Sequence, residues 1–91
     1  MSSNQRLEAA HQHCRANESE LRQSNVAGCF YCQSVFPATK VTHFLENERT
    51  ALCPECRIDS VLGDASGFPI APPFLAEMHQ YWFERFSHGA L

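Results

Sequence analysis

The amino-acid sequence predicts a small α+β domain, and three observations carry that prediction. The chain has 91 residues, which at a typical domain size of roughly 100 residues or more makes one domain, 1–91. Apolar residues recur at helical spacing near both ends, whereas a β-branched run typical of a strand lies in the middle. Two Cys-x-x-Cys pairs stand on either side of that run. We divide the chain into an N-terminal helix, 1–24, a central module, 28–63, and a loop with a C-terminal helix, 64–91.

Composition and charge narrow the classes of function. Hydrophobic residues make up 44% of the chain, aromatic residues 11% and charged residues 19%, which is typical of a globular protein. No apolar run approaches the roughly 18–20 residues that span a bilayer, so we expect no membrane helix. The polar N-terminus has no apolar signal region, so we expect a cytoplasmic protein. Seven Lys and Arg against ten Asp and Glu give a net charge of −3, which disfavours a broad basic surface for nucleic acid.

The N-terminal segment is expected to form one helix over about 3–22. It contains neither proline nor glycine, and Leu7, Cys14 and Leu21 belong to an apolar stripe at three- and four-residue steps. Because the stripe is thin, this helix must dock on another part of the fold. Cys14 is the odd cysteine, and we expect a half-buried thiol on the docking face. The alternatives are a reactive thiol or, together with His11, part of a metal site.

The central module is expected to hold a hairpin followed by a helix. The run 40–45 predicts a strand, 46–48 a turn and 49–52 the returning strand. Pro54 suits the first position of a helix, and Gly63 suits its end. We therefore expect a helix that opens with the second cysteine pair.

The C-terminal segment predicts a helix over about 73–87, which begins after a proline pair. Its aromatic and apolar residues cover more surface than one narrow helix stripe requires. Most of them are expected to cover the central module, and the remainder to meet a partner protein or a second subunit. The expected partner-binding residues are Tyr81, Trp82, Phe83 and Phe86.

The two cysteine pairs are the strongest signal in the sequence. Two residues between cysteines let one tight turn direct both sulfurs at one ion, and the intervening hairpin brings the second pair back to the first. A reducing cytosol disfavours disulfides, and soft thiolates select zinc or an iron–sulfur cluster. A catalytic zinc keeps one position open, whereas four thiolates close the coordination sphere. We expect one structural Zn²⁺ per chain, with four ligands: Cys29, Cys32, Cys53 and Cys56.

The order of a knuckle, a hairpin and a helix that opens with the last two ligands predicts a treble-clef zinc finger. A zinc ribbon is the alternative, in which the second cysteine pair forms another knuckle with no helix behind it. Arg57 follows the last cysteine, where many such knuckles carry glycine. We expect a helical conformation there, which tolerates arginine.

Four segments carry a resemblance to known proteins: GCFYC at 28–32, TALCPEC at 50–56, IDSVLG at 58–63 and GFPI at 67–70. This string resembles a family of small bacterial proteins usually described as hypothetical cytoplasmic proteins. The resemblance covers roughly 29–83. It implies a zinc-containing intracellular bacterial protein and no particular activity.

Several residues suggest other functions. His43 lies between the cysteine pairs, where HNH-type nucleases place metal-binding histidines, but no second ligand follows it, so we expect a surface histidine. A hydrolase interpretation uses Asp59, Ser60, Asp64 and Ser66, but we expect Asp59 to support a helix N-terminus and the segment 64–67 to form a turn. Two aromatic residues of the first knuckle and two arginines could bind nucleic acid: Phe30, Tyr31, Arg49 and Arg57. We expect the two aromatic residues to cover the metal site instead.

We therefore expect no catalytic residues and no enzyme activity. The favoured function is a cytoplasmic protein-interaction or adaptor module, with a homodimer as one form of partnership. The alternative is a nucleic-acid-binding or regulatory zinc finger, followed by a metal-dependent hydrolase.

Overall fold

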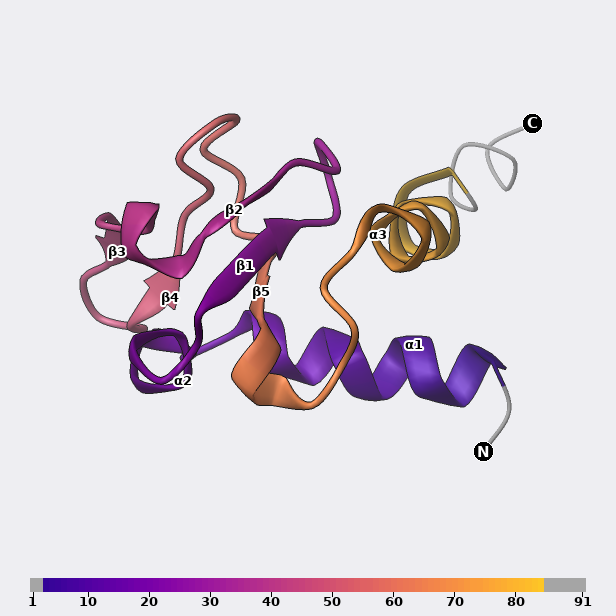
Figure 1. Ribbon diagram of the computed structural model, residues 1–91, viewed down its shortest axis with the longest axis horizontal. Coiled ribbons are helices and arrows are strands. Elements are labelled where there is room, and N and C mark those ends of the chain that lie inside the picture. Colours follow the sequence, from indigo (N-terminus) through magenta and orange to yellow (C-terminus); the bar gives the residue numbers. More distant parts are fainter. Residues whose placement is uncertain (1–2, 85–91) are drawn as a thin grey trace.

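A three-stranded antiparallel sheet forms the centre of the fold (Figure 1). The computed structural model describes residues 3–84. The strand order is β2-β1-β5, with β1 at Val26–Cys29, β2 at Val35–Pro37 and β5 at Val61–Gly63. Because β1 pairs with both neighbours, β1, which ends at the first cysteine pair, lies beside β5, which follows the second pair.

A separate two-stranded hairpin stands at one side of this sheet. It pairs β3, Phe44–Leu45, with β4, Thr50–Ala51. The predicted hairpin is therefore confirmed, but both strands are shorter than expected, and Ala38–Lys40 forms a 3₁₀ turn before it.

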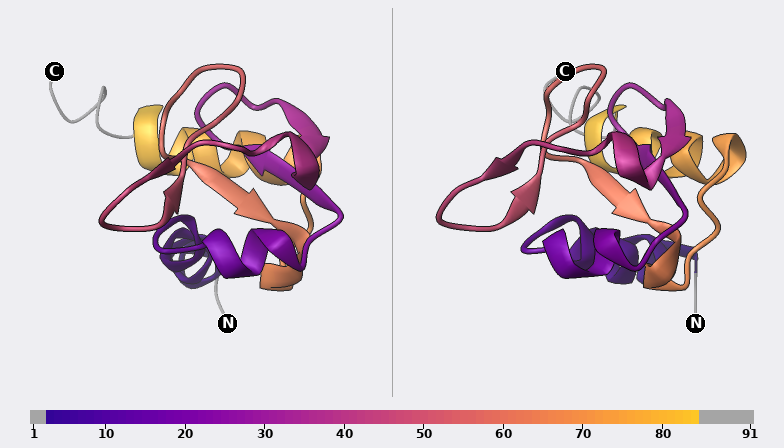
Figure 2. Two further views of the ribbon diagram at one scale, coloured as in Figure 1. Left: turned by 90° about the vertical axis from the view of Figure 1, so that its left-hand side faces the viewer. Right: turned by 60° about the vertical axis from the view of Figure 1, so that its left-hand side comes forward.

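The helices lie on both sides of the central sheet (Figure 2). Near the N-terminus, α1 covers Ser3–His11, a 3₁₀ turn covers Gln12–Cys14 and α2 covers Glu18–Arg22. Near the C-terminus, α3 covers Pro72–His79 and continues into a π-helical turn. The other elements are a 3₁₀ turn at Asp64–Ser66 and that π-helical turn at Gln80–Glu84. No helix among residues 3–84 has the length and apolar character needed to cross a membrane.

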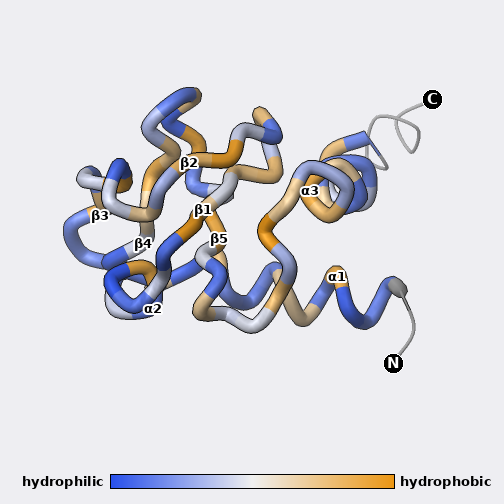
Figure 3. Tube along the Cα trace, in the orientation of Figure 1, coloured by the Kyte–Doolittle hydropathy of each residue, from blue (hydrophilic) through white to orange (hydrophobic). Residues whose placement is uncertain are grey.

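The two faces of the sheet carry two different clusters of buried side chains. On one face, Cys29 and Val61 pack with Leu21 of α2 and with residues of the hairpin. On the other face, Leu62 packs with α1 and with Leu75 of α3. This alternation along β5 follows from the two-residue period of a strand. In Figure 3 hydrophobic residues are frequent along the sheet, whereas hydrophilic and hydrophobic residues alternate along α1.

Gly28 allows α3 to approach the sheet closely. A Cβ atom at Gly28 would lie 2.8 Å from Cδ1 of Leu75 and 3.0 Å from Cγ2 of Ile70. Any larger side chain would push α3 away from β1, because the interior is close-packed.

The predicted N-terminal helix is interrupted, and the interruption buries a polar side chain. Arg15 is extended, with φ −120° and ψ 143°, and ends the first helical stretch; Ala16 then has φ 47°, and α2 begins two residues later. The amide of Asn17 then enters the protein, where its Nδ2 donates to the Val61 carbonyl at 2.8 Å and its Oδ1 accepts from Ala51 N–H at 3.0 Å. Long-range hydrogen bonds thus replace the continuous helix.

The helix predicted from Cys53 to Gly63 is wrong. A turn follows Cys53, and Val61–Gly63 is the inner strand β5. The apolar residues Ile58, Val61 and Leu62 fit helical spacing, but Val61 and Leu62 face opposite sides of the sheet. Asp59 therefore supports no helix N-terminus. The predicted C-terminal helix is confirmed as far as Glu84, and Phe86 lies outside the described residues.

Candidate metal centre

The structure brings the four predicted cysteine ligands together. Cys29 and Cys32 stand at the end of β1, and Cys53 and Cys56 lie in the segment between β4 and β5. All four Sγ atoms lie within 4.8 Å of one another. Two distances run between the pairs: 3.7 Å from Cys29 to Cys56 and 3.7 Å from Cys32 to Cys53. The cluster therefore joins two segments that are distant in sequence.

These distances fit a tetrahedral metal site. Sulfur atoms about 2.3 Å from a central ion stand about 3.8 Å apart along each edge of the tetrahedron. A disulfide would need an S–S distance of about 2.05 Å. Four thiolates are soft ligands and suit Zn²⁺ or an iron–sulfur cluster better than Mg²⁺ or Ca²⁺. The residues present can therefore hold one metal ion.

Both cysteine pairs lie in turns with the same hydrogen-bond pattern. In the first, Cys29 N–H donates to the Ser34 carbonyl at 3.0 Å, and Gln33 N–H donates to the Cys29 carbonyl at 2.8 Å. In the second, Cys53 N–H donates to the carbonyl five residues later at 3.0 Å, and Arg57 N–H donates to the Cys53 carbonyl at 2.9 Å. The structure thus has two knuckles, and no helix follows the second. In that respect it matches the zinc-ribbon alternative.

Backbone N–H groups point at the sulfurs inside the knuckles. Tyr31 N–H lies 3.3 Å from the Cys29 sulfur, and Glu55 N–H lies 3.3 Å from the Cys53 sulfur. Cys56 N–H also lies 3.4 Å from the Cys53 sulfur. Such donors offset the negative charge that four thiolates concentrate around one dication.

The pKa values of the cluster differ with burial and hydrogen bonding. Burial raises the pKa of Cys29 and that of Cys56. Burial acts in the same direction on Cys32, but hydrogen bonds from the side chain and backbone of Ser34 and from neighbouring cysteines outweigh it and lower its pKa to about 7. Cys32 is also exposed, whereas Cys29 and Cys53 are fully buried. Cys32 is therefore more easily ionised and more easily reached from solvent than Cys29 or Cys56.

The fifth residue of each knuckle has left-handed backbone, which the sequence did not reveal. Gln33 has φ 64° and Arg57 has φ 70°. The helical conformation expected at Arg57 is therefore wrong. Each N–H at this position closes the knuckle on the first cysteine, so the positive φ is built into the turn. Glycine adopts this conformation without the steric penalty that a Cβ atom brings.

Replacing Arg57 by glycine should therefore stabilise the protein. We expect Arg57→Gly to raise the free energy of unfolding of the metal-loaded chain by about 0.5–1 kcal/mol, measured by thermal or urea denaturation. Glu55→Gly is the matched control, since Glu55 lies in the same turn without positive φ; this change should destabilise slightly. A loss of stability in Arg57→Gly would show that the arginine side chain matters more than the backbone strain.

The other residues considered in the sequence lie outside the cluster. Cys14 is buried, with 4% of its surface exposed, on the inner side of the N-terminal segment. His43 is exposed beside the hairpin, as expected. The predicted turn at 64–67 is confirmed, since Gly67 N–H donates to the Asp64 carbonyl at 3.0 Å. The Asp64 carboxylate accepts hydrogen bonds from the backbone N–H groups of Asn25 and Val26 at 2.9 and 3.4 Å. Among residues 3–84, the four cysteines form the only group of three or more potential metal ligands close enough to share an ion.

Burial of Cys14 predicts a loss of stability in alkali. Burial, followed by the charge of Asp59, raises the pKa of this thiol to about 11 from 9.0. Above pH 9 the unfolded chain loses this proton before the folded chain does, so the free energy of unfolding should fall as the pH rises toward 11. We expect Cys14→Ala to have a shallower decline than wild type over this range in urea denaturation of metal-loaded protein. If the free energy of unfolding fell equally steeply in wild type and in Cys14→Ala, the loss of stability in alkali could not be assigned to Cys14.

The aromatic residues of the first knuckle pack against the C-terminal helix, and Phe30 belongs to the buried cluster on the other face of the sheet from Cys29 and Cys53. Phe30 is buried, its ring centroid lies 5.8 Å from that of Phe83, and its carbonyl accepts a hydrogen bond from Nδ1 of His79 at 3.1 Å. Tyr31 contacts Phe83 edge to face at 4.9 Å but remains 43% exposed. The end of the C-terminal helix therefore covers the outer side of the first knuckle.

The predicted partner-binding residues Tyr81, Trp82 and Phe83 are half-buried against the fold. Trp82 stacks on His11 with ring centroids 4.0 Å apart, and its indole N–H points at the Leu7 carbonyl at 3.4 Å. The Tyr81 hydroxyl donates a hydrogen bond to a carboxylate oxygen of Glu8. These contacts use part of each side chain to join α1 to the C-terminal helix, and part remains at the surface.

Comparisons with known proteins add no relative: no family model, curated protein or solved structure matches the chain.

Proposed function

We propose that Cys29, Cys32, Cys53 and Cys56 hold one structural Zn²⁺ ion per chain. The observation that carries this proposal is the arrangement of the four sulfurs, with two 3.7 Å distances between the knuckles and all atoms within 4.8 Å. Four thiolates complete a tetrahedron and leave no position for water or substrate, which favours a structural role over catalysis. The cytoplasm, where thiols stay reduced, suits such a site.

The ion would connect the two halves of the central module. Its ligands come from the end of β1 and from the segment before β5, and two of them are buried in the same cluster as Val61. A chain this small buries only about 60% of the surface that its unfolded state exposes, so an added cross-link contributes a large share of its stability. We therefore propose that the metal serves the fold, while the function lies on the surface.

Protein–protein interaction is the function that this surface supports best. Tyr31 is 43% exposed next to Phe83, and Tyr81 and Trp82 present further aromatic surface from the same helix. Tyr and Trp are enriched among residues that anchor protein interfaces. We propose that these residues, Tyr31 and Phe83 at the first knuckle and Tyr81 and Trp82 beside α1, form the contact surface of an adaptor module.

Nucleic-acid binding is the weaker alternative. Arg6 pairs with Glu77 at 3.1 Å, and both Arg22 and Arg49 pair with Glu18 at 2.6 and 3.0 Å. Three arginines are thus partly neutralised by carboxylates, in a chain whose net charge is −3. A nucleic-acid complex would weaken steeply with added salt, whereas an apolar protein contact would not.

Native mass spectrometry of the untagged protein tests the metal and the assembly together. We expect one zinc per chain, lost on treatment with a chelator. A dimer that Tyr31→Ala weakens would identify the aromatic surface as a self-contact, with Val35→Ala as the control, since Val35 is 42% exposed on β2. If the protein is a monomer, we expect the aromatic surface to bind a different protein, which crosslinking would identify. A second metal per chain would contradict the structural interpretation.

A further inference from the structure

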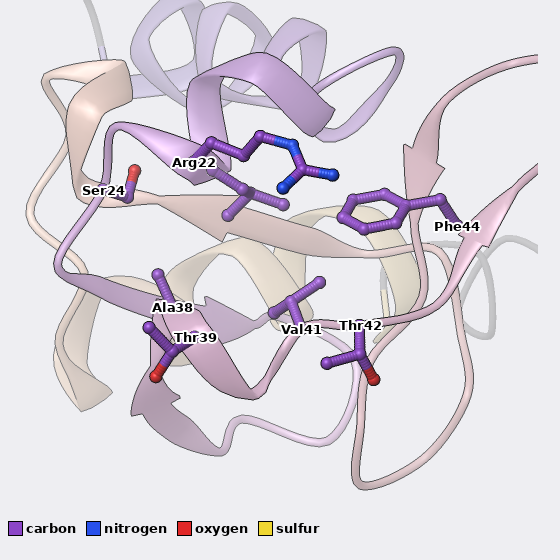
Figure 4. A pocket seen from close by; sticks show the side chains of 8 residues that line it. Arg22, Ser24, Ala38, Thr39, Val41, Thr42 and Phe44 are labelled. Carbon is purple, nitrogen blue, oxygen red and sulfur yellow. The ribbon is translucent and has the colours of Figure 1, made fainter.

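A cavity separate from the cysteine cluster lies between α2 and the segment that links β2 to β3 (Figure 4). Its volume is about 480 Å³, within the range of roughly 300–1,000 Å³ typical of small-molecule sites. None of the four cysteines lines it. Its lining residues are Leu21, Arg22, Ser24, Ala38, Thr39, Val41, Thr42 and Phe44.

The floor of the cavity is apolar and already formed. Leu21, Ala38 and Val41 belong to the buried cluster that also contains two of the cysteines, so they are held by the packed interior. Phe44 packs against the same cluster and is only half-buried. An apolar or aromatic group could therefore cover the Phe44 ring without moving the backbone.

The polar side of the cavity carries one formal charge, and that charge is positive. Within residues 3–84, Arg22 is the only charged residue that lines the cavity. Figure 4 shows its guanidinium extending across the cavity toward the Phe44 ring. Its Nη2 atom donates a hydrogen bond to the Glu18 carboxylate at 2.6 Å, and the same carboxylate accepts another from Arg49 at 3.0 Å. Because Arg49 already shares that carboxylate, the group of two arginines and one glutamate keeps a net positive charge beside the cavity.

The hydroxyl groups of the lining have different tasks. Ser24 is used by the fold, since its Oγ donates to the Glu20 carbonyl at 2.9 Å and accepts from Ala65 N–H at 3.0 Å. Thr42 shares a hydrogen bond with His43 at 3.1 Å. Thr39 is exposed at the opening and adds a further hydroxyl. A cation above an apolar floor, with hydroxyls at the rim, is complementary to a small anion that has an apolar body.

We propose that this cavity binds a small organic carboxylate with an aromatic or branched apolar body. The carboxylate pairs with the free edge of the Arg22 guanidinium, and the body lies on Val41 and Phe44. Planar guanidinium groups bind carboxylates through two parallel hydrogen bonds, which gives the site its preference for an anion. This inference goes beyond the proposed structural metal and adaptor role and does not depend on either.

Phenylacetate is the probe for this site, added to the metal-loaded full chain and followed by ¹H–¹⁵N correlation spectra. We expect saturable shifts confined to the amides of 21–24 and 38–44. Phenylacetamide lacks the negative charge, and acetate lacks the phenyl ring. Each should therefore bind about tenfold more weakly than phenylacetate. Equal shifts with phenylacetate and phenylacetamide, or no saturable shifts in these two segments, would overturn the proposal.

Two arginine variants form a matched pair. Arg22→Gln should weaken phenylacetate binding by about tenfold, because it removes the cation in the cavity. Arg49→Gln leaves the cavity lining unchanged and removes only the second partner of Glu18, so phenylacetate binding should weaken clearly less than in Arg22→Gln, by about threefold at most. Equal losses in both variants would show a general charge effect and no site. Both residues are exposed, so both variants should keep the wild-type fold.

Discussion

Removal of the metal should unfold the protein. With a strong chelator, we expect the dispersed NMR spectrum and the near-ultraviolet circular dichroism to collapse, and both to return when Zn²⁺ is restored. The reason is energetic: structural zinc contributes an apparent ~10–16 kcal/mol, which is as large as the whole net stability of about 5–15 kcal/mol typical of a domain. A chelated chain that keeps its dispersed spectrum would show that the packed core is sufficient alone.

Single cysteine variants separate the cluster from the fifth thiol. Cys53→Ser removes a fully buried ligand and should abolish both metal retention and folding. Cys14→Ala is the control, because Cys14 is also buried but belongs to the other side of the sheet. It should keep a full metal complement with only a modest loss of stability. Loss of metal in Cys14→Ala would contradict the ligand assignment.

Truncation of Asn17 should have the largest effect of any change outside the cysteine cluster. Asn17→Ala removes the partners of Ala51 N–H and the Val61 carbonyl, which are the points where the chain enters and leaves the second knuckle segment. Each buried group left without a partner costs about 1–3 kcal/mol, so we expect a loss of about 3 kcal/mol in the free energy of unfolding by urea denaturation.

Asn25→Ala is the matched control for this prediction, because the Asn25 side chain is exposed. The free energy of unfolding of the Asn25→Ala variant should differ from that of wild type by less than about 0.5 kcal/mol. Since metal binding is coupled to folding, Asn17→Ala should also weaken zinc affinity in a competition assay with a chromophoric chelator. Unchanged stability and affinity would show that the Asn17 hydrogen bonds have no role in holding the knuckle.

The candidate site could be predicted from the sequence because its signal is local. A spacing of two residues between cysteines already directs two sulfurs to one point, and Cys29, Cys32, Cys53 and Cys56 do lie together. The details of the knuckles could not be predicted in the same way. The positive φ at Gln33 and Arg57 occurs in residues that normally avoid it, so only the closed turn explains it.

The helix assigned to the second half of the central module failed for a different reason. Ile58, Val61 and Leu62 satisfy helical spacing, and a short apolar run fits a helix or a buried strand equally well. The pairing with β1 decides between them, and that partner lies about thirty residues earlier in the chain. Strands of three or four residues, such as β1 and β2, leave too little pattern to be recognised from the sequence.

The break in the N-terminal helix was also set by distant partners. No proline or glycine marks it, and the positive φ falls on Ala16. The break exists because Asn17 satisfies backbone groups of Ala51 and Val61, which are 34 and 44 residues away. Local propensity gives no indication of such contacts, whereas the long periodic pattern of α3 was recognisable by itself.

X-ray absorption spectroscopy at the zinc edge tests the central claim most directly. On the protein as isolated, we predict zinc surrounded by four sulfur atoms at about 2.3 Å, and the same shell in Cys14→Ala. A shell that contains nitrogen or oxygen ligands, or a protein that carries iron in place of zinc, would contradict a closed structural zinc centre built from these four cysteines.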